Sequence, residues 1–341
     1  MEKLRVGVVG CGRISNTYRA ALKQLEDEVD VVWAVDKVLA RAQAFAASFP
    51  GCRAADTLEP MLADPPQAVH ILTPHHLHKQ QAIACLRAGA HVLTEKPVAL
   101  HLSDAREMAQ EARRCGRWLA VVSQNRYIPG IVHARKLIQE GRLGALRGAW
   151  SQLTWWRPPS YYECDWKGSW ETEGGGVVID QAIHSIDLVR WLMDSPVKAV
   201  QGHIARRILT NIEVEDEADA AIEFENGAMY AFFACNYYTH NSPIRLEIDG
   251  EKGSVLLEGE TVTVSLKGEK PYRILPCDDV LEGESYWGNN HLEQIREFYQ
   301  SIREDRQPPV PTEEAAATLE TVLALYRSAW LSARQTLPLR D

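Results

Sequence analysis

Near its start the chain reads Leu4-Arg5-Val6-Gly7-Val8-Val9-Gly10-Cys11-Gly12-Arg13-Ile14-Ser15, and this stretch decides the fold. The apolar run predicts a strand and the glycines a tight turn. A helix then follows through Tyr18, Ala21, Leu22 and Leu25. Gly10 permits the turn, and Gly12 lets backbone N–H groups approach a diphosphate at the positive end of the helix. Strand, glycine turn and helix together predict a dinucleotide-binding site that includes Gly10, Gly12, Arg13 and Ile14.

A second predicted strand, Val29 to Val35, ends in Asp36. A carboxylate at this place accepts hydrogen bonds from the adenosine ribose hydroxyls and repels a 2′-phosphate, which favours NAD over NADP. Lys37 comes directly afterwards and partly offsets that repulsion, so NADP stays open as the alternative. Asp36 and Lys37 therefore join the predicted cofactor site.

Predicted helices and strands then alternate up to Val122, which indicates a parallel sheet with helices on both faces. Ligands of such sheets bind at the carboxyl ends of the strands. Three polar segments follow predicted strands there: residues 73–78, which read Thr-Pro-His-His-Leu-His, Glu95-Lys96-Pro97, and residues 123–127. We expect these segments to add Thr73, Pro74, His75, His78, Glu95, Lys96 and Gln124 to the cofactor site.

Lys96 is the sharpest candidate for chemistry in this half. It follows a strand and precedes a proline, which restricts its backbone, and it would face the nicotinamide. Partial burial there would lower the pKa of its ammonium toward that of an acid–base group. The alternative is a surface lysine paired with Glu95. The histidines of residues 75–78 have no cysteine or carboxylate nearby at ligand spacing, and we predict no metal.

A second glycine segment, Glu173-Gly174-Gly175-Gly176, leads into an apolar run with helical spacing. The glycines allow the backbone to pass tightly or to admit a flat ligand. Asp180 and His184 lie four residues apart and would share one face of this helix, with Asp187 three residues further on. A carboxylate beside an imidazole can handle protons on a small ligand. The alternative is a carboxylate favoured by the helix dipole and a hydrogen-bonded interior histidine.

From Ala145 onward long alternating stretches predict a second domain with a large, mostly antiparallel sheet and helices on one side. Asn226-Gly227 is a hairpin signal between two of these strands. We predict an N-terminal domain of residues 1–123 and a C-terminal domain of residues 124–341, whose last helix, at about 312–331, packs back on the first. A broad uncovered sheet face also predicts a homo-oligomer, a dimer or a tetramer.

Aromatic and polar side chains gather in the sequence between residues 155 and 170. Flat rings with polar tips suit stacking on a sugar ring, although we expect at least half of them to be core residues. Asn289-Asn290-His291 opens a further predicted helix and could add a polar contact. The predicted substrate residues are Lys96, Arg126, Tyr127, Trp155, Tyr162, Trp166, Asp180 and His184.

Length and composition set the remaining bounds. The chain has 341 residues, of which 45% are hydrophobic and 24% charged, as expected for a globular protein of about two domains. A net charge of −9 argues against a nucleic-acid partner. No signal-type segment or membrane-spanning run is seen, and the seven cysteines are dispersed. We therefore expect a soluble cytoplasmic protein with no membrane partner.

These motifs together resemble the glucose–fructose oxidoreductase/inositol dehydrogenase family, called Gfo/Idh/MocA. The resemblance spans nearly the whole chain and rests on the first glycine turn, Thr73-Pro74, residues 88–97 and residues 174–187. It implies a Rossmann domain, an open-sheet α+β domain and a substrate held between them above the nicotinamide. It also implies that Lys96, Asp180 and His184 are catalytic, with Lys96 or His184 as the base.

The resemblance implies an NAD(P)-dependent dehydrogenase that oxidises a secondary alcohol of a sugar, sugar derivative or cyclitol. Two alternatives remain open at this point. One is reduction of a C=C or C=N bond on the same scaffold, and the other is a non-catalytic NAD-binding regulator.

Overall fold

The computed structural model describes all residues except 1, 277–289 and 341. The chain divides into two compact units. The first comprises the chain up to Gln124, together with a helix near the C-terminus and the beginning of the last helix up to Ala316. The second runs from Asn125 through the last long hairpin and resumes at Ala317. Asn289, predicted to open a helix, lies outside the described residues.

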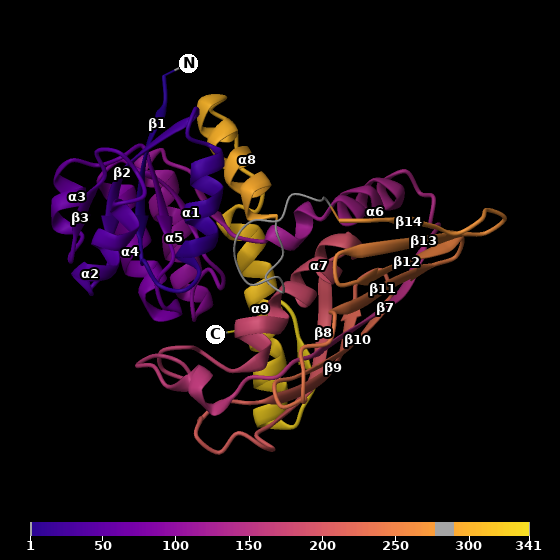
Figure 1. The fold of residues 1–341 in the computed structure, drawn as a ribbon. Coiled ribbons are helices and arrows are strands. Elements are labelled where there is room, and N and C mark those ends of the chain that lie inside the picture. Colours follow the sequence, from indigo (N-terminus) through magenta and orange to yellow (C-terminus); the bar gives the residue numbers. More distant parts are fainter. Residues whose placement is uncertain (1, 277–289, 341) are drawn as a thin grey trace. The chain divides into compact units, whose positions relative to one another are not determined.

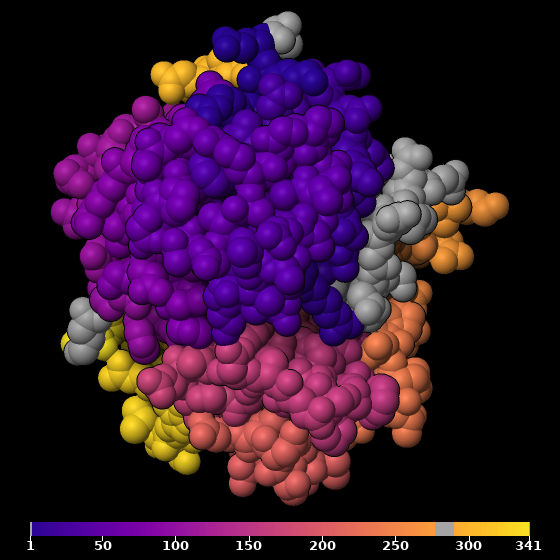
Figure 2. Space-filling model, turned by 60° about the vertical axis from the view of Figure 1, so that its left-hand side comes forward, coloured from indigo at the N-terminus to yellow at the C-terminus, as the bar shows by residue number. Residues whose placement is uncertain are grey.

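The first unit is built on a six-stranded parallel sheet in the order β3-β2-β1-β4-β5-β6 (Figure 1). This confirms the predicted doubly wound sheet. The residues of the first unit up to Gln124 form the continuous indigo-to-purple body in Figure 2. The strands are β1 (Leu4–Val9), β2 (Val29–Val35), β3 (Arg53–Ala55), β4 (Ala68–Ile71), β5 (His91–Thr94) and β6 (Leu119–Val121). The helices are α1 (Ser15–Gln24), α2 (Leu39–Ala46), α3 (Glu59–Ala63), η1 (His75–Leu77), α4 (His78–Arg87), α5 (Leu102–Cys115) and α8 (His291–Arg303).

The core of the first unit explains why β1 is apolar along its length. Val6 and Val8 are fully buried, as expected for a central parallel strand covered on both faces. On one face, Tyr18 and Leu22 of α1 pack with Phe298 and Tyr299 of α8 in the same apolar cluster. A helix distant in sequence thus completes the dinucleotide-type sheet.

The second unit contains a nine-stranded sheet in the order β14-β13-β12-β11-β7-β10-β9-β8-β15. Its pairs are antiparallel except for β10 with β7, which confirms a mostly antiparallel sheet. Asn226-Gly227 forms the predicted hairpin turn, in which Gly227 has φ +85°. The strands are β7 (Leu146–Thr154), β8 (Val197–Ala205), β9 (Glu217–Phe224), β10 (Met229–Cys235), β11 (Arg245–Gly250), β12 (Gly253–Glu258), β13 (Thr261–Leu266), β14 (Tyr272–Ile274) and β15 (Gln335–Thr336).

Helices of the second unit pack on this sheet: α6 contacts β12, β13 and β14, and α7 contacts β7 and β11. The helical segments are η2 (Gln124–Tyr127), α6 (Pro129–Gln139), η3 (Pro159–Tyr162), η4 (Val178–Ala182), α7 (Ile183–Met193) and α9 (Thr312–Leu331). Of these, η2 and α9 begin in the first unit.

The last helix, α9, has the predicted bounds and contacts both units. Thr312 donates to the carbonyl of Leu119 in the first unit. Further along, Thr318 and Tyr326 bond Asp187 and Glu215 of the second unit. The start of this helix thus belongs to the first unit and its later turns belong to the second. Within the described part of the chain, no helix is both long and apolar enough to span a membrane.

Candidate active site

The glycine turn after β1 has the geometry that a close ligand approach requires. Gly10 has φ +94°, and a Cβ there would lie 2.8 Å from the backbone of Leu72, so a side chain is excluded. A Cβ at Gly12 would meet no atom within 4 Å, and the space over this residue is open. Ser15 opens α1 and donates from its hydroxyl to the carbonyl of Gly12 at 2.6 Å. The turn therefore presents backbone at the start of a helix, as a diphosphate site needs.

Asp36 links the end of β2 to this turn. Its Oδ2 accepts the N–H of Cys11 and its Oδ1 the N–H of Val38, both at 2.8 Å. A carboxylate offers about four lone pairs, so these two bonds orient the group and leave acceptor capacity for ribose hydroxyls. Lys37 is exposed beside it.

The segment after β4 serves more than one purpose. His75 is 4% exposed, and Thr73 and Pro74 are partly exposed. His78 is fully buried, and both of its ring nitrogens lie 2.8 Å from main-chain oxygens, those of Pro97 and Thr73. The imidazole thus ties the loop after β4 to the loop after β5. These contacts give His78 a positioning role in the fold, and its predicted place in the cofactor site stays a prediction.

Glu95, which precedes the candidate lysine, lies in a buried polar cluster. Its carboxylate accepts from the hydroxyl of Tyr18 at 2.9 Å and lies 3.7 Å from Nε2 of His291. Burial alone would raise the pKa of Glu95, but His291, Lys96 and Tyr18 lower it to about 2. The backbone N–H of Lys96 also points to Oε2 of Glu95, at 3.3 Å. A fixed negative charge therefore lies directly beside Lys96 in the chain.

In the second unit, packing explains two of the three glycines, Gly175 and Gly176. A Cβ at Gly175 would lie 2.1 Å from the hydroxyl of Tyr326, and one at Gly176 would lie 1.9 Å from the carbonyl oxygen of Glu215. Glu215 is 2% exposed and accepts the N–H groups of Gly176 and Val178. Of the two predicted uses of the glycines, the structure shows tight passage of the backbone.

The buried carboxyl of Glu215 predicts a pH-dependent stability. Burial, the largest cause, raises the pKa of Glu215 to about 7, although the N–H groups of Val178 and Gly176 and the hydroxyl of Tyr326 oppose it. The folded protein then binds a proton that the unfolded chain releases near its ordinary pKa. We expect the contribution of Glu215 to stability to be fully present below that value and to fall as the pH rises toward 7. The free energy of unfolding should change by up to about 3 kcal/mol as a result. Thermal unfolding between pH 4.5 and 8 measures it.

Glu215→Gln is the matched variant for this prediction, since it keeps the shape and removes the titration. We expect it to lower stability by about 1–3 kcal/mol, because its amide group meets backbone N–H donors. In this variant, the part of the pH dependence of stability that is due to Glu215 should vanish. A variant with the same slope as the parent would assign the pH dependence to other groups.

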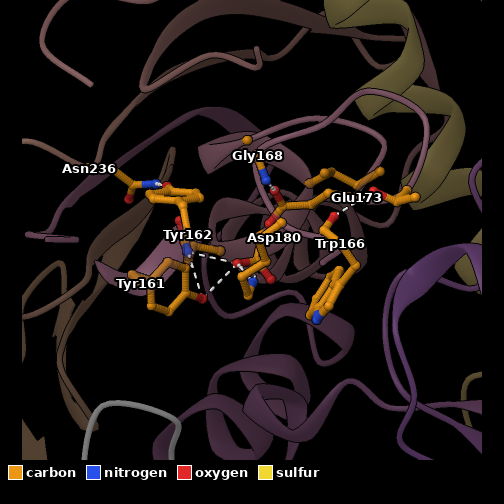
Figure 3. A network of polar contacts seen from close by, with 12 residues as sticks. Tyr161, Tyr162, Trp166, Gly168, Glu173, Asp180 and Asn236 are labelled. Carbon is orange, nitrogen blue, oxygen red and sulfur yellow. Dashed lines mark hydrogen bonds and ion pairs between the residues drawn. The ribbon is translucent and has the colours of Figure 1, made fainter. Parts of the chain in front are cut away.

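Asp180 lies in a single turn of π-helix, η4, that precedes α7 and His184. Such turns occur frequently at functional sites. Oδ2 of Asp180 accepts three hydrogen bonds, from Nζ of Lys167 at 2.6 Å, Tyr161 at 2.8 Å and Gln181 at 2.9 Å (Figure 3). Asp180 is 8% exposed and His184 is half-buried.

The sequence analysis missed Lys167. A lysine flanked by two tryptophans a few residues before a glycine segment was the available signal. Nζ of Lys167 also bonds Oε1 of Glu173 at 3.2 Å, and it lies over the rings of Tyr161 and Trp166. Burial alone would lower the pKa of Lys167, but Asp180, Tyr161 and Glu173 raise it above its ordinary value. The ammonium is therefore held charged.

Arg126, one of the predicted substrate residues, forms a buried bidentate ion pair with Asp187. Nε and Nη2 of Arg126 lie 2.7 and 2.6 Å from the two carboxylate oxygens of Asp187. Thr318 of α9 also donates to Asp187, at 2.9 Å. Both charged residues are buried, with Arg126 6% exposed and Asp187 5% exposed. This bonding joins η2, α7 and α9 and gives Arg126 a structural role, while its predicted contact with substrate stays a prediction.

The aromatic residues divide between core and site. Trp155 is buried, donates to the carbonyl of Ser242 and faces Arg157. Tyr162 is buried among Leu209, Ile212 and Val214, and its hydroxyl accepts from Asn236. These contacts make Trp155 and Tyr162 core residues. Trp166 and Tyr127 are partly exposed and stay predicted substrate contacts.

Lys96 belongs to the first unit, and Asp180 and His184 belong to the second. Gln124, the last residue of the first unit, is 4% exposed. Among the described residues, no group of histidine, cysteine, aspartate or glutamate side chains is arranged to hold a metal ion.

Comparison with known proteins identifies the class. Residues 4–123 match the model of an oxidoreductase family with an NAD-binding Rossmann fold, and residues 131–256 match the GFO/IDH/MocA C-terminal domain. The chain belongs to the Gfo/Idh/MocA family of oxidoreductases. It is an NAD-binding dehydrogenase, which confirms the predicted resemblance, enzyme class and cofactor.

Individual relatives give a more detailed comparison. The chain is 30% identical over 281 residues, 80% of each sequence, to a 1,5-anhydro-D-fructose reductase of Ensifer adhaerens. It is 26% identical to a D-glucoside 3-dehydrogenase of Escherichia coli, over 96% of this chain and 95% of the relative. A solved structure of the WlbA dehydrogenase from Bordetella pertussis with NADH and UDP-GlcNAcA is 32% identical, covers 99% of both chains and has a TM-score of 0.89.

Proposed function

We propose that this dehydrogenase oxidises a secondary alcohol of a sugar, a sugar derivative or a cyclitol, with NAD⁺ as the hydride acceptor. The observation that carries the proposal is Asp180, whose carboxylate accepts three hydrogen bonds in the π-helical turn η4. The other unit of the same chain has the NAD-type glycine turn. The relatives named above act on an anhydro-sugar or a glucoside, or bind a nucleotide-linked sugar, which supports a sugar substrate.

In this proposal the reaction balances without a metal. The carbinol C–H bond breaks and its electron pair leaves as hydride to C4 of the nicotinamide, so the alcohol is oxidised and NAD⁺ is reduced. The hydroxyl proton passes to Lys96 or His184. Asp180 stays ionised, because three donors stabilise its carboxylate, and it orients the hydroxyl and the charged partner.

The cofactor residues of the proposal are Gly10, Gly12, Arg13, Ile14, Asp36, Lys37, Thr73, Pro74, His75, Glu95, Lys96 and Gln124. We propose NAD over NADP because the carboxylate of Asp36, at the end of β2, repels a 2′-phosphate. Association of two or four copies through the sheet of the second unit also stays a proposal. A monomeric mass in light scattering would remove it.

The test is NADH formation, followed by absorbance, with a panel of aldoses, glucosides, inositols and nucleotide-linked sugars. Product analysis with deuterated NADH then locates the transferred label. Label on a carbinol carbon supports the proposal. Label on a carbon of a former C=C bond, or on the carbon of a former C=N bond, would replace the proposal with the alternative reductase. Absence of turnover across the panel, with NAD bound, would contradict the proposed substrate class.

A further inference from the structure

Lys167 lies in the loop before the three glycines and is a buried cation. Its side chain is 12% exposed, and its ammonium lies 2.6 Å from Asp180 and 3.2 Å from Glu173. Taking an ammonium out of water costs several kcal/mol unless charged partners and hydrogen bonds compensate for it. The buried ammonium of Lys167 is therefore stabilised by the two carboxylates, and the ammonium stabilises their negative charge in return.

Two carboxylates share this one ammonium, and their surroundings differ. Glu173 is fully buried, and its second oxygen accepts the backbone N–H of Gly168. Burial, with Asp180 nearby, raises the pKa of Glu173, and Lys167 only partly opposes this. Asp180 instead receives three side-chain donors on one oxygen. Compared with Glu173, Asp180 has the shorter contact with Lys167 and the greater number of side-chain donors. The negative charge that pairs with the ammonium therefore lies on Asp180.

The walls around the ammonium are aromatic. Nζ of Lys167 lies 4.5 Å from the ring centre of Tyr161 and 4.3 Å from that of Trp166. Trp166 is fixed in turn, because its carbonyl accepts from Thr172 at 2.6 Å. These rings attract the cation and restrict its movement, so that its direction toward Asp180 is set before any ligand arrives.

A lysine needed only to close the loop would be satisfied by Glu173, which lies six residues away in the same loop. The closer partner is instead Asp180, in the π-helical turn. We propose that Lys167 is a positioning residue of the dehydrogenase reaction, which holds Asp180 in one orientation and in its charged form. This inference rests on the proposed function, in which Asp180 orients the substrate hydroxyl.

Lys167→Met tests the inference, because methionine has a similar length and no charge. We expect kcat to fall by about 10- to 100-fold, as for loss of a positioned charged group. The acid limb of the kcat profile should move up by at least about one pH unit, because the pKa of Asp180 rises when its cation is removed. Lys167→Gln, which keeps a donor without the charge, should shift the same limb. The polar groups near Asp180 and Glu173, among them Tyr161, Tyr162, Gln181, His184 and Tyr326, are unchanged in both variants.

Lys198→Met is the matched control, since Lys198 is an exposed lysine paired with Glu223 in the same unit. It should keep the kcat and pH profile of the parent. Asp180→Asn is measured alone and combined with Lys167→Met. If Lys167 acts through Asp180, the second change adds less than about 3-fold to the loss caused by the first.

The outcomes separate the inference from the proposed function. Parental activity in Asp180→Asn would overturn the proposed role of Asp180 and the inference with it. An inactive Asp180→Asn together with a parental kcat and acid limb in Lys167→Met would overturn the inference alone. Failure of both Lys167 variants to fold, judged by thermal unfolding, would assign the residue to the fold and would also overturn it.

Discussion

Lys96→Ala is expected to lower kcat by at least ~100-fold while NAD⁺ still binds, because a positioned proton-transfer group contributes about that much to turnover. The geometry of the glycine turn depends on Gly10 and Asp36, which this variant leaves unchanged. Binding of NADH, followed by its fluorescence, should therefore stay within a few-fold of the parent. Turnover is followed by NADH absorbance with the best substrate of the panel.

Lys79→Met is the control for this variant. Lys79 lies on α4 of the same unit and pairs with Asp104 and Glu107. Removing it should leave kcat unchanged. An unaltered rate in Lys96→Ala would make the proposed mechanism untenable, whereas a large loss of NADH affinity would assign Lys96 to the cofactor and not to proton transfer.

Gly176→Ala is expected to destabilise the second unit by at least about 3 kcal/mol, since the added methyl group overpacks a filled interior. Its Cβ would lie 1.9 Å from the carbonyl oxygen of Glu215, a main-chain atom that also accepts the N–H of Val177. A shift of this atom would disturb the N–H groups that Gly176 and Val178 donate to Glu215. Thermal unfolding of the whole chain measures the loss.

Gly227→Ala separates this clash from backbone strain. Gly227 has φ +85° in the hairpin between β9 and β10, and a Cβ there would meet no atom within 4 Å. We expect it to cost only the strain of a left-handed residue, about 1–2 kcal/mol. A loss in Gly176→Ala no larger than that in Gly227→Ala would contradict the predicted clash, since Gly176 is not among the glycines with positive φ.

The amino-acid sequence by itself determined the features that short windows encode. The apolar run of β1, the turn at Gly10 and the acid after β2 predicted the parallel sheet and its NAD site, because strand propensity, turn geometry and helix spacing are local properties. The bounds of α9 and the hairpin at Asn226-Gly227 followed for the same reason. The choice of Lys96, Asp180 and His184 came from resemblance of motifs, and their roles stay predictions.

Only the tertiary structure decided which charged groups meet. His291 reaches Glu95 from a helix that follows the first segment of the second unit in sequence, and Arg126 is paired with Asp187. Lys167 reaches Asp180 from a loop that has no regular spacing relative to it. The physical reason is that a buried charge is stabilised by whichever partner long-range packing brings within hydrogen-bond distance. That partner leaves no periodic signal in the chain.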